Sequence, residues 1–382
     1  MQHIEAMEHR TRGSLAAGRE SPWTRWERWA AKASICLLLA AGTSAWAAGS
    51  AHVAAQIRLP LGVLGDSDSH SYQDALSFPR GGALRGGTYR QGTLQWTEVL
   101  ARIRGDYVDP GPWGIWGTRG TVAELQEWLG RDGRAPQKQD FRYNFAYSGA
   151  ECAQLTEGRW RQTQRLLALM DRDSALWRRG VIVIRIGINS FGRGSDLERL
   201  ARNREDATVR SEIGQCVDQI ARAVGLIRKG HPETFIVLVG IFDDSNIPEH
   251  FGQWQAAVER ANIKAGLDVF DNALRSMARA DRRAAFFDDR QFFRELWGGR
   301  SRLGRPDYRS VPIDADRAVT NTQGDHPRNA VLADNHAGVV WNALWAAALV
   351  RLLDARAGTS IPQITRREIA QLVEPIWPST AR

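Results

Sequence analysis

The sequence predicts an α/β fold built on an open parallel sheet. Short apolar segments alternate with longer segments of helical periodicity, which is typical of successive βαβ units. Two of the short segments, 180–191 and 234–242, are almost continuously apolar and often β-branched, as expected for strands buried on both faces of a sheet. We therefore expect a domain in which a strand is regularly followed by a helix.

The expected elements follow in order along the chain. Each expected strand is short, apolar and often β-branched, and each expected helix is longer with apolar residues on one face. The expected strands are 54–65, 141–149, 180–191, 234–242 and 284–289. The expected helices are 93–105, 151–170, 211–230 with a glycine cap, 254–281 and 337–358.

Two segments interrupt this alternation. Residues 73–140 form a long insertion after the first strand, with "RGGALRGG" and "DPGPWGIWGTRG" inside it. Residues 300–333 are also loop-like. Long connections are uncommon in compact domains and often build binding sites, so both segments are candidates for a functional role.

The composition is that of a globular protein with a sizeable core. Of 382 residues, 43% are hydrophobic and 25% are charged, which argues against global disorder. The formal net charge of +8 is carried mostly by arginines that are scattered along the chain. Because no basic run with interleaved aromatic residues occurs, we interpret the charge as a solvated surface and expect no nucleic-acid partner.

The N-terminal 48 residues carry the marks of an export signal. A polar, arginine-rich segment, 1–32, precedes the apolar stretch "ASICLLLAAGTSAWAAGSA", which contains the small-residue pattern Ala45-Trp46-Ala47. This order is typical of a secretory signal peptide, with cleavage near Ala47 or Ala48. The alternative is an uncleaved membrane anchor extending to Val53. We therefore expect an exported protein, periplasmic or secreted, with its α/β domain in 49–382.

Two cysteines, Cys152 and Cys216, remain beyond this segment. In an oxidising compartment they could form one disulfide, and two separate thiols are the alternative. Neither lies in a CxxC motif or a Cys/His cluster, so the sequence gives no support to a zinc site. We expect neither a metal nor an organic cofactor.

Polar residues follow the expected strands at their carboxyl ends. The first strand delivers Gly65-Asp66-Ser67, the second delivers Asn144–Gly149 and the third delivers Gly187-Ile188-Asn189. Asp334-Asn335-His336 immediately precedes the last helix. Ligands of open parallel sheets bind at this edge, so a hydroxyl, hydrogen-bond donors and an imidazole are expected on one face.

These four segments resemble the SGNH (GDSL-type) hydrolase family. "GDS", "NFAYSGA", "GIN" and "DNH" occur in the order of the family's motifs and span most of the chain beyond the N-terminal segment. The resemblance implies a flavodoxin-like three-layer α/β/α sandwich with a central parallel sheet. It also implies a serine esterase or acyl hydrolase activity.

The resemblance assigns a role to five residues. Ser67 matches the nucleophile, and His336 matches the general base that takes its proton. The amide groups of Ser67 and Gly149 and the side chain of Asn189 match the donors of the oxyanion hole. Asp334 matches the carboxylate that orients the histidine ring.

The third member of the triad departs from the family pattern. The family usually has Asp three residues before its histidine, where this chain has Ala333. Asp334 lies two residues before His336 and is the favoured member, with Asp325 as the substitute and a helix-capping role as the structural alternative for Asp334. His70, close to Ser67 in the sequence, is the alternative base.

The substrate is less defined than the reaction. Four of the 15 tryptophans, Trp96, Trp113, Trp116 and Trp128, lie in the insertion, where they could stack on sugars or pack it against the core. We expect an exported esterase acting through an acyl-enzyme on a carbohydrate O-acetyl ester. The alternatives are a lipid or lysophospholipid ester, acyl transfer to a polysaccharide, or a non-catalytic envelope binding protein with the same fold.

Overall fold

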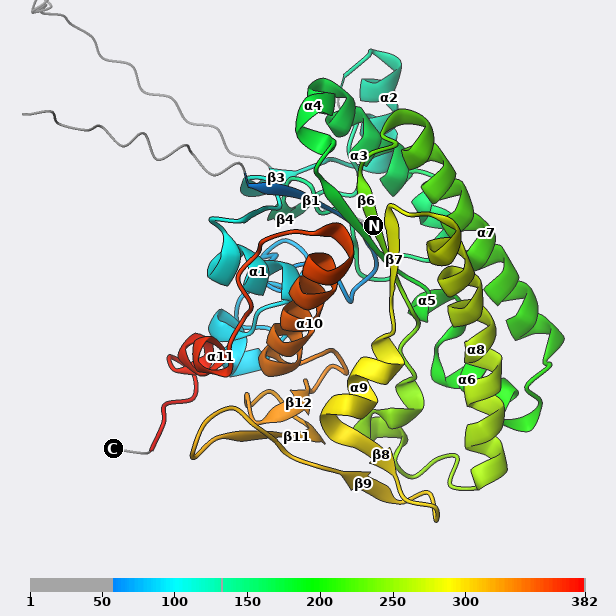
Figure 1. Cartoon of the computed structure of the whole chain (residues 1–382), viewed down its shortest axis with the longest axis vertical. Helices are drawn as coiled ribbons and strands as arrows, with labels where there is room; N and C mark the ends of the chain where they lie inside the picture. The colour runs from blue at the N-terminus through cyan, green and yellow to red at the C-terminus, as the bar shows by residue number, and fades with distance from the viewer. Residues whose placement is uncertain (1–57, 132, 381–382) are drawn as a thin grey trace, which may run out of the picture. The chain divides into compact units, whose positions relative to one another are not determined.

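A parallel five-stranded sheet lies at the centre of the molecule, in the order β2-β1-β5-β6-β7 (Figure 1). The computed structural model describes residues 58–131 and 133–380. The sheet confirms the predicted α/β class. Its strands are β1 (Leu59–Gly65), β2 (Val108–Asp109), β5 (Val181–Arg185), β6 (Phe235–Val239) and β7 (Ala284–Phe287).

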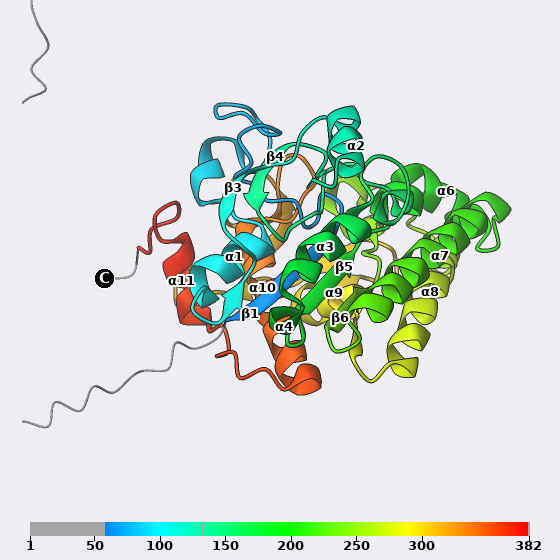
Figure 2. The ribbon, with the colours of Figure 1, turned by 90° about the horizontal axis from the view of Figure 1, so that it is seen from above.

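Successive side chains along each strand point to opposite faces of the sheet and pack into two separate hydrophobic cores. In β5, Val181 and Val183 join the core on one face, whereas Ile182 and Ile184 join the core on the other. Figure 2 shows the helices that cover the two faces. One face is covered by α1 (Trp96–Arg104), α9 (Asp289–Trp297), α10 (Val339–Ala357) and α11 (Arg366–Val373). The other is covered by α3 (Gln162–Met170), α6 (Gly194–Arg202), α7 (Ala207–Gly230) and α8 (Ala257–Ala280).

Smaller elements decorate this three-layer arrangement. The segment 300–333, which the sequence predicts to be loop-like, contains short strands. They pair in a three-stranded and a two-stranded sheet. The remaining helices are α2 (Gly120–Trp128), α4 (Ser174–Trp177) and α5 (Ile188–Phe191). The remaining strands are β3 (Trp113–Trp116), β4 (Lys138–Phe141), β8 (Gly298–Arg300), β9 (Pro306–Tyr308), β10 (Val311–Pro312), β11 (Ala318–Gln323) and β12 (Asn329–Val331).

The prediction of a strand over 141–149 is wrong. Strand β4 ends at Phe141, and the chain beyond it runs irregularly beside β1 with one isolated parallel bridge, Val63 to Asn144. The Asn144 side chain donates to the carbonyl of Ser69 at 2.7 Å, which pins this segment to the loop after β1. The regular neighbour of β1 at this edge is β2, which pairs only with the first two residues of β1.

Two predicted helices begin elsewhere than expected. The helix predicted over 151–170 starts at Gln162, because Gly158 (φ 65°) and Arg161 (φ 35°) interrupt the segment before it. Helix α7 starts at Ala207, where the side chain of Asp206 accepts two backbone N–H groups, and it ends at Gly230 without the predicted glycine cap.

The predicted export signal or anchor, residues 1–48, lies outside the described residues. Within residues 58–131 and 133–380, no helix combines the length and the apolarity that crossing a membrane requires.

Candidate active site

The turn after β1 places Ser67 at the carboxyl edge of the sheet. Asp66 Oδ1 accepts the amide of Asp68 at 3.0 Å, and the Asp66 amide donates to the carbonyl of Arg185 in β5 at 3.3 Å. A Cβ atom on Gly65 would lie 2.2 Å from that carbonyl oxygen, so the strand must end in glycine. Ser67 is 8% exposed, and its hydroxyl has no hydrogen-bond partner among the described residues.

The carboxyl group of Asp66 makes the stability of this turn depend on pH. Burial and the neighbouring Asp68 carboxylate raise the pKa of Asp66 from 3.8 to about 8. Between these two pKa values the folded state holds a proton on Asp66 that the unfolded chain has lost. The free energy of unfolding therefore falls as the pH rises from about 4 to about 8. We expect Asp66→Asn to raise Tm relative to the wild type more at pH 8.5 than at pH 5. Thermal unfolding of both proteins at the two pH values measures the difference, and a pH-independent difference would contradict it.

The two predicted oxyanion donors outside the nucleophile turn lie close together. Gly149 is exposed with φ 82°, in a segment that Tyr147 anchors by donating its amide to the carbonyl of Gly65 at 3.1 Å. Asn189, on the short helix α5, donates from Nδ2 to the carbonyl of Ala150 at 3.0 Å. The Asn189 amide carries a second N–H, so one donor is left for a ligand.

His336 lies on the loop that precedes α10. Its Nδ1 atom is 2.9 Å from the carbonyl oxygen of Asp334 and 3.3 Å from Asp334 Oδ1. Asn335 between them has φ 65°, which turns the loop so that Asp334 faces the ring. The N-cap of α10 is Gly338, so Asp334 does not cap the helix. Nε2 of His336 has no hydrogen-bond partner among the described residues, which leaves it available to a hydroxyl.

The charge of Asp334 is stabilised by its neighbours. Burial opposes ionisation, yet the hydrogen bond with His336 and the charge of Arg85 outweigh it and hold the pKa of Asp334 below its ordinary value. The substitute, Asp325, accepts the amide of Ala333 at 3.2 Å and makes no hydrogen bond with His336. Of the two candidate carboxylates, only Asp334 therefore contacts the ring.

His70 is too enclosed to act as the alternative base for Ser67. The side chain is fully buried, with Nε2 2.9 Å from Asp74 Oδ2 and Nδ1 3.0 Å from Ser148 Oγ. Burial lowers the pKa of His70 to about 4, so the ring is neutral at physiological pH. Both ring nitrogens therefore have hydrogen-bond partners. The ring positions Ser148, the residue before Gly149, and is not free to serve as a base for Ser67.

Arg85, inside the "RGGALRGG" stretch, is a site residue that sequence reasoning missed. Its guanidinium group is buried and reaches Asp334, His336 and Ser148. The clustered glycines around it are the one sequence signal that could have indicated an unusual backbone here.

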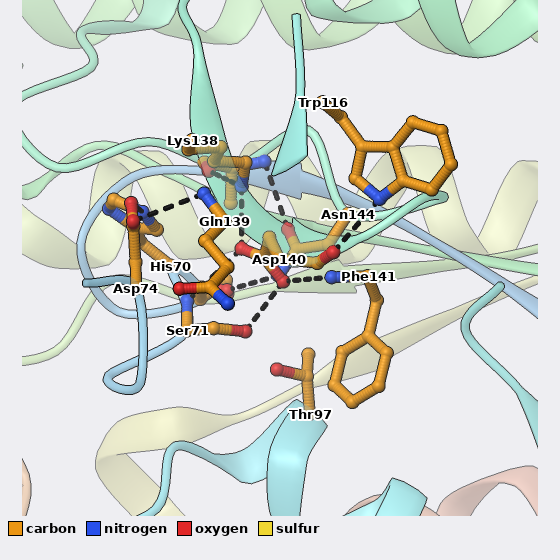
Figure 3. A network of polar contacts seen from close by, with 12 residues as sticks. His70, Ser71, Asp74, Thr97, Trp116, Lys138, Gln139, Asp140, Phe141 and Asn144 are labelled. Atoms are coloured by element: carbon orange, nitrogen blue, oxygen red, sulfur yellow. Dashed lines mark hydrogen bonds and ion pairs between the residues drawn. The ribbon is translucent and has the colours of Figure 1, made fainter. Parts of the chain in front are cut away.

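A buried polar network supports the loop after β1, which carries Ser67 (Figure 3). The Asp140 carboxylate pairs with Lys138 Nζ at 2.7 Å and accepts the Ser71 hydroxyl at 2.5 Å. It also accepts the side-chain amide of Asn144 at 3.2 Å. Because Ser71 follows Ser67 and Asn144 leads to Gly149, the network fixes the two loops that carry candidate groups relative to each other.

The four tryptophans of the insertion have different surroundings. Trp96 is fully buried against Trp345 and donates from its indole to the carbonyl of Asp68 at 3.2 Å, so it supports the turn after β1. Trp116 donates to the carbonyl of Asp140 at 3.0 Å. Trp113 and Trp128 are 39% and 81% exposed. Core packing thus explains Trp96, whereas Trp128 lies on the surface.

A polar cavity of about 630 Å³ opens next to Asn189. The disulfide between Cys152 and Cys216, whose Cα atoms are 5.0 Å apart, lies in its wall and resolves the pairing that the sequence leaves open. A second cavity, of about 310 Å³, lies at the opposite ends of the strands, beside Leu59 and Val181. Among the described residues, no cluster of three or more His, Cys, Asp or Glu side chains could hold a metal ion.

Comparison with protein-family models gives no match, and comparison with curated proteins gives none either. Similar solved structures include a lipase from a goat rumen metagenome, 13% identical over 77% of this chain and 96% of that chain, with a TM-score of 0.35. A candidate GDSL-like lipase from Parabacteroides merdae is 14% identical over 78% and 97% of the two chains, also with a TM-score of 0.35. Both structures are thus described as lipases, one of them as GDSL-like, and both are similar to this chain only at low identity.

Proposed function

We propose that this chain is a serine esterase that cleaves carboxylic esters through an acyl-enzyme. One observation carries the proposal: His336 turns Nδ1 towards Asp334, and neither its Nε2 atom nor the hydroxyl of Ser67 has a hydrogen-bond partner among the described residues. A histidine held in this way by a carboxylate is suited to remove the proton of a serine hydroxyl.

The reaction follows from the roles of these groups. Ser67 Oγ attacks the ester carbonyl while Nε2 of His336 accepts the hydroxyl proton. The amides of Ser67 and Gly149 and the side chain of Asn189 donate to the oxyanion of the tetrahedral intermediate. The alcohol then leaves with the proton from Nε2, and water attacks the acyl group in the reverse sense to release the acid and Ser67. Asp334 stays ionised and stabilises the imidazolium.

The cavity beside Asn189 favours a polyhydroxylated substrate over a lipid. Its wall is dominated by hydrogen-bonding side chains, among them Glu157, Ser190, Gln215 and Gln219. Hydroxyl groups of a sugar can form further hydrogen bonds with such side chains, whereas an acyl chain can form none. An O-acetylated carbohydrate is therefore the substrate class that we propose, with an envelope location supported by the N-terminal segment and by the Cys152–Cys216 disulfide.

Active-site labelling tests the proposal on the full chain. A fluorophosphonate probe should form one adduct, located by mass spectrometry on the peptide containing Ser67. Ser148→Ala is the matched control, because Ser148 is a serine on the same edge of the sheet that also contacts a histidine, and this variant should label normally. A folded wild type that stays unlabelled would favour a non-catalytic binding protein, and an adduct on Ser148 would overturn the assignment of Ser67.

Release of acid from competing substrates then separates the substrate classes. Acetate should be released from an O-acetylated oligosaccharide faster than the long-chain acid is released from p-nitrophenyl decanoate. The reverse preference would indicate a lipid esterase. Transfer of acetyl groups to an added sugar acceptor, without release of free acetate, would indicate an acyltransferase.

A further inference from the structure

Arg85 is held in place by its backbone and by aromatic rings. It adopts φ 57°, a conformation that is uncommon for residues other than glycine, and Gly86 follows it with φ 97°. The guanidinium carbon lies 4.4 Å from the centroid of the Phe78 ring and 5.2 Å from that of Tyr72. Arg85 is only 3% exposed, so this arginine is built into the site.

The polar contacts of Arg85 join the candidate base to the loop of Gly149. Its amide and its Nη1 atom donate to Asp334 Oδ2 at 2.9 and 2.5 Å. The same Nη1 atom is 2.8 Å from His336 Nδ1, and Nη2 is 3.4 Å from Ser148 Oγ. Asp334 is thus held by two donors of one residue.

These contacts bear on which ring nitrogen of His336 carries the proton. A guanidinium group can only donate hydrogen bonds, so a bond from Nη1 to Nδ1 would require an unprotonated Nδ1. The proton would then be on Nε2, and the ring could not accept a proton from Ser67. Nη1 carries two N–H groups, so it can donate to Asp334 Oδ2 and to Nδ1 at the same time, whereas an Nδ1–H would donate to the carbonyl oxygen or Oδ1 of Asp334, both of which lie within reach.

We propose that Arg85 is a positioning residue that fixes the Asp334 carboxylate against His336 and thereby governs which ring nitrogen of His336 carries the proton. The need for such a residue follows from the spacing, because Asp334 is only two residues from the histidine that it must face. This inference rests on the proposed esterase function, since it assigns Arg85 a task in that reaction.

Arg90 provides a matched control for the experiment. It is also a buried arginine beside Phe78, and it donates to the backbone carbonyls of Asp74 at 2.9 Å and Pro79 at 3.2 Å. Unlike Arg85, it makes no hydrogen bond or ion pair with Asp334 or His336. Arg90→Ala therefore disturbs the same loop without removing the group that holds the carboxylate.

Steady-state kinetics with p-nitrophenyl acetate give the first readout. We expect Arg85→Ala to lower kcat about 10- to 100-fold, with KM changed less than about threefold, because positioning for proton transfer is lost while ester binding is retained. Added guanidinium ion at millimolar concentration should restore part of the activity of Arg85→Ala and none in Arg90→Ala. Equal losses of kcat in both variants, without rescue, would overturn the proposal.

The tautomer of His336 gives a second readout that does not depend on activity. With ¹⁵N-labelled histidine and His336→Ala for assignment, the wild type and Arg85→Ala should differ in the fraction of His336 rings that carry the proton on Nδ1. An identical tautomer in both proteins would contradict the role of Arg85. If the wild type hydrolyses no ester and the two proteins still differ in the tautomer of His336, the esterase proposal fails while the positioning role stands.

Discussion

Replacing Ser67 with alanine should lower kcat for p-nitrophenyl acetate by at least about three powers of ten, because the acyl-enzyme can no longer form. His336→Ala should cost a similar factor, since the hydroxyl then lacks its base. The two residues act as one unit, so the double variant should be no slower than either single variant. Initial rates of the wild type and the three variants, with folding checked by circular dichroism, measure this result.

Two carboxylate variants serve as controls for this prediction. Asp334→Ala should reduce kcat because the ring loses its partner, whereas Asp325→Ala should leave kcat close to that of the wild type, since Asp325 contacts the amide of Ala333 and not the ring. Substantial activity in Ser67→Ala, or losses that multiply in the double variant with His336→Ala, would show that these residues do not form a catalytic unit.

The positions of the candidate groups could be predicted from the sequence because strand ends determine them. Ser67 follows β1 and Asn189 follows β5, and parallel strands bring their carboxyl ends to the same edge. The apolar segments that identify β5 and β6 are continuous, since both faces of these strands are buried. In this part of the chain, the apolar sequence pattern therefore matches the burial of the strands in the folded protein.

Contacts between distant segments explain what could not be predicted. The strand expected over 141–149 is an irregular segment that pairs with β1 through one isolated bridge, and its Asn144 side chain donates to the carbonyl of Ser69 in the loop after β1. Arg85 approaches His336 across 251 positions of sequence, and its role depends on a left-handed backbone conformation that no hydrophobic pattern encodes. Such groups leave a weak signal in the sequence, namely the surrounding glycines.

The buried ion pair between Lys138 and Asp140, which contacts the loop after β1, leads to the second large expected effect. Lys138 and Asp140 have side chains that are 2% and 0% exposed, and burial lowers the pKa of Lys138 to about 8. Lys138 also donates to the carbonyl of Ala146. Both charged side chains are therefore removed from water. The surrounding hydrogen bonds offset the free-energy cost of this desolvation.

Asp140→Ala should destabilise the fold by about 3–5 kcal/mol, because it leaves the Lys138 ammonium and the Ser71 hydroxyl buried without the carboxylate. Lys138→Met should cost less, since the Asp140 carboxylate keeps its hydrogen bonds from Ser71 and Asn144. In the double variant the buried charge is absent altogether, so its loss should be smaller than the sum of the single losses. Urea unfolding of the three variants measures the coupling, and strictly additive losses would show that Lys138 and Asp140 do not stabilise the loop after β1 as a pair.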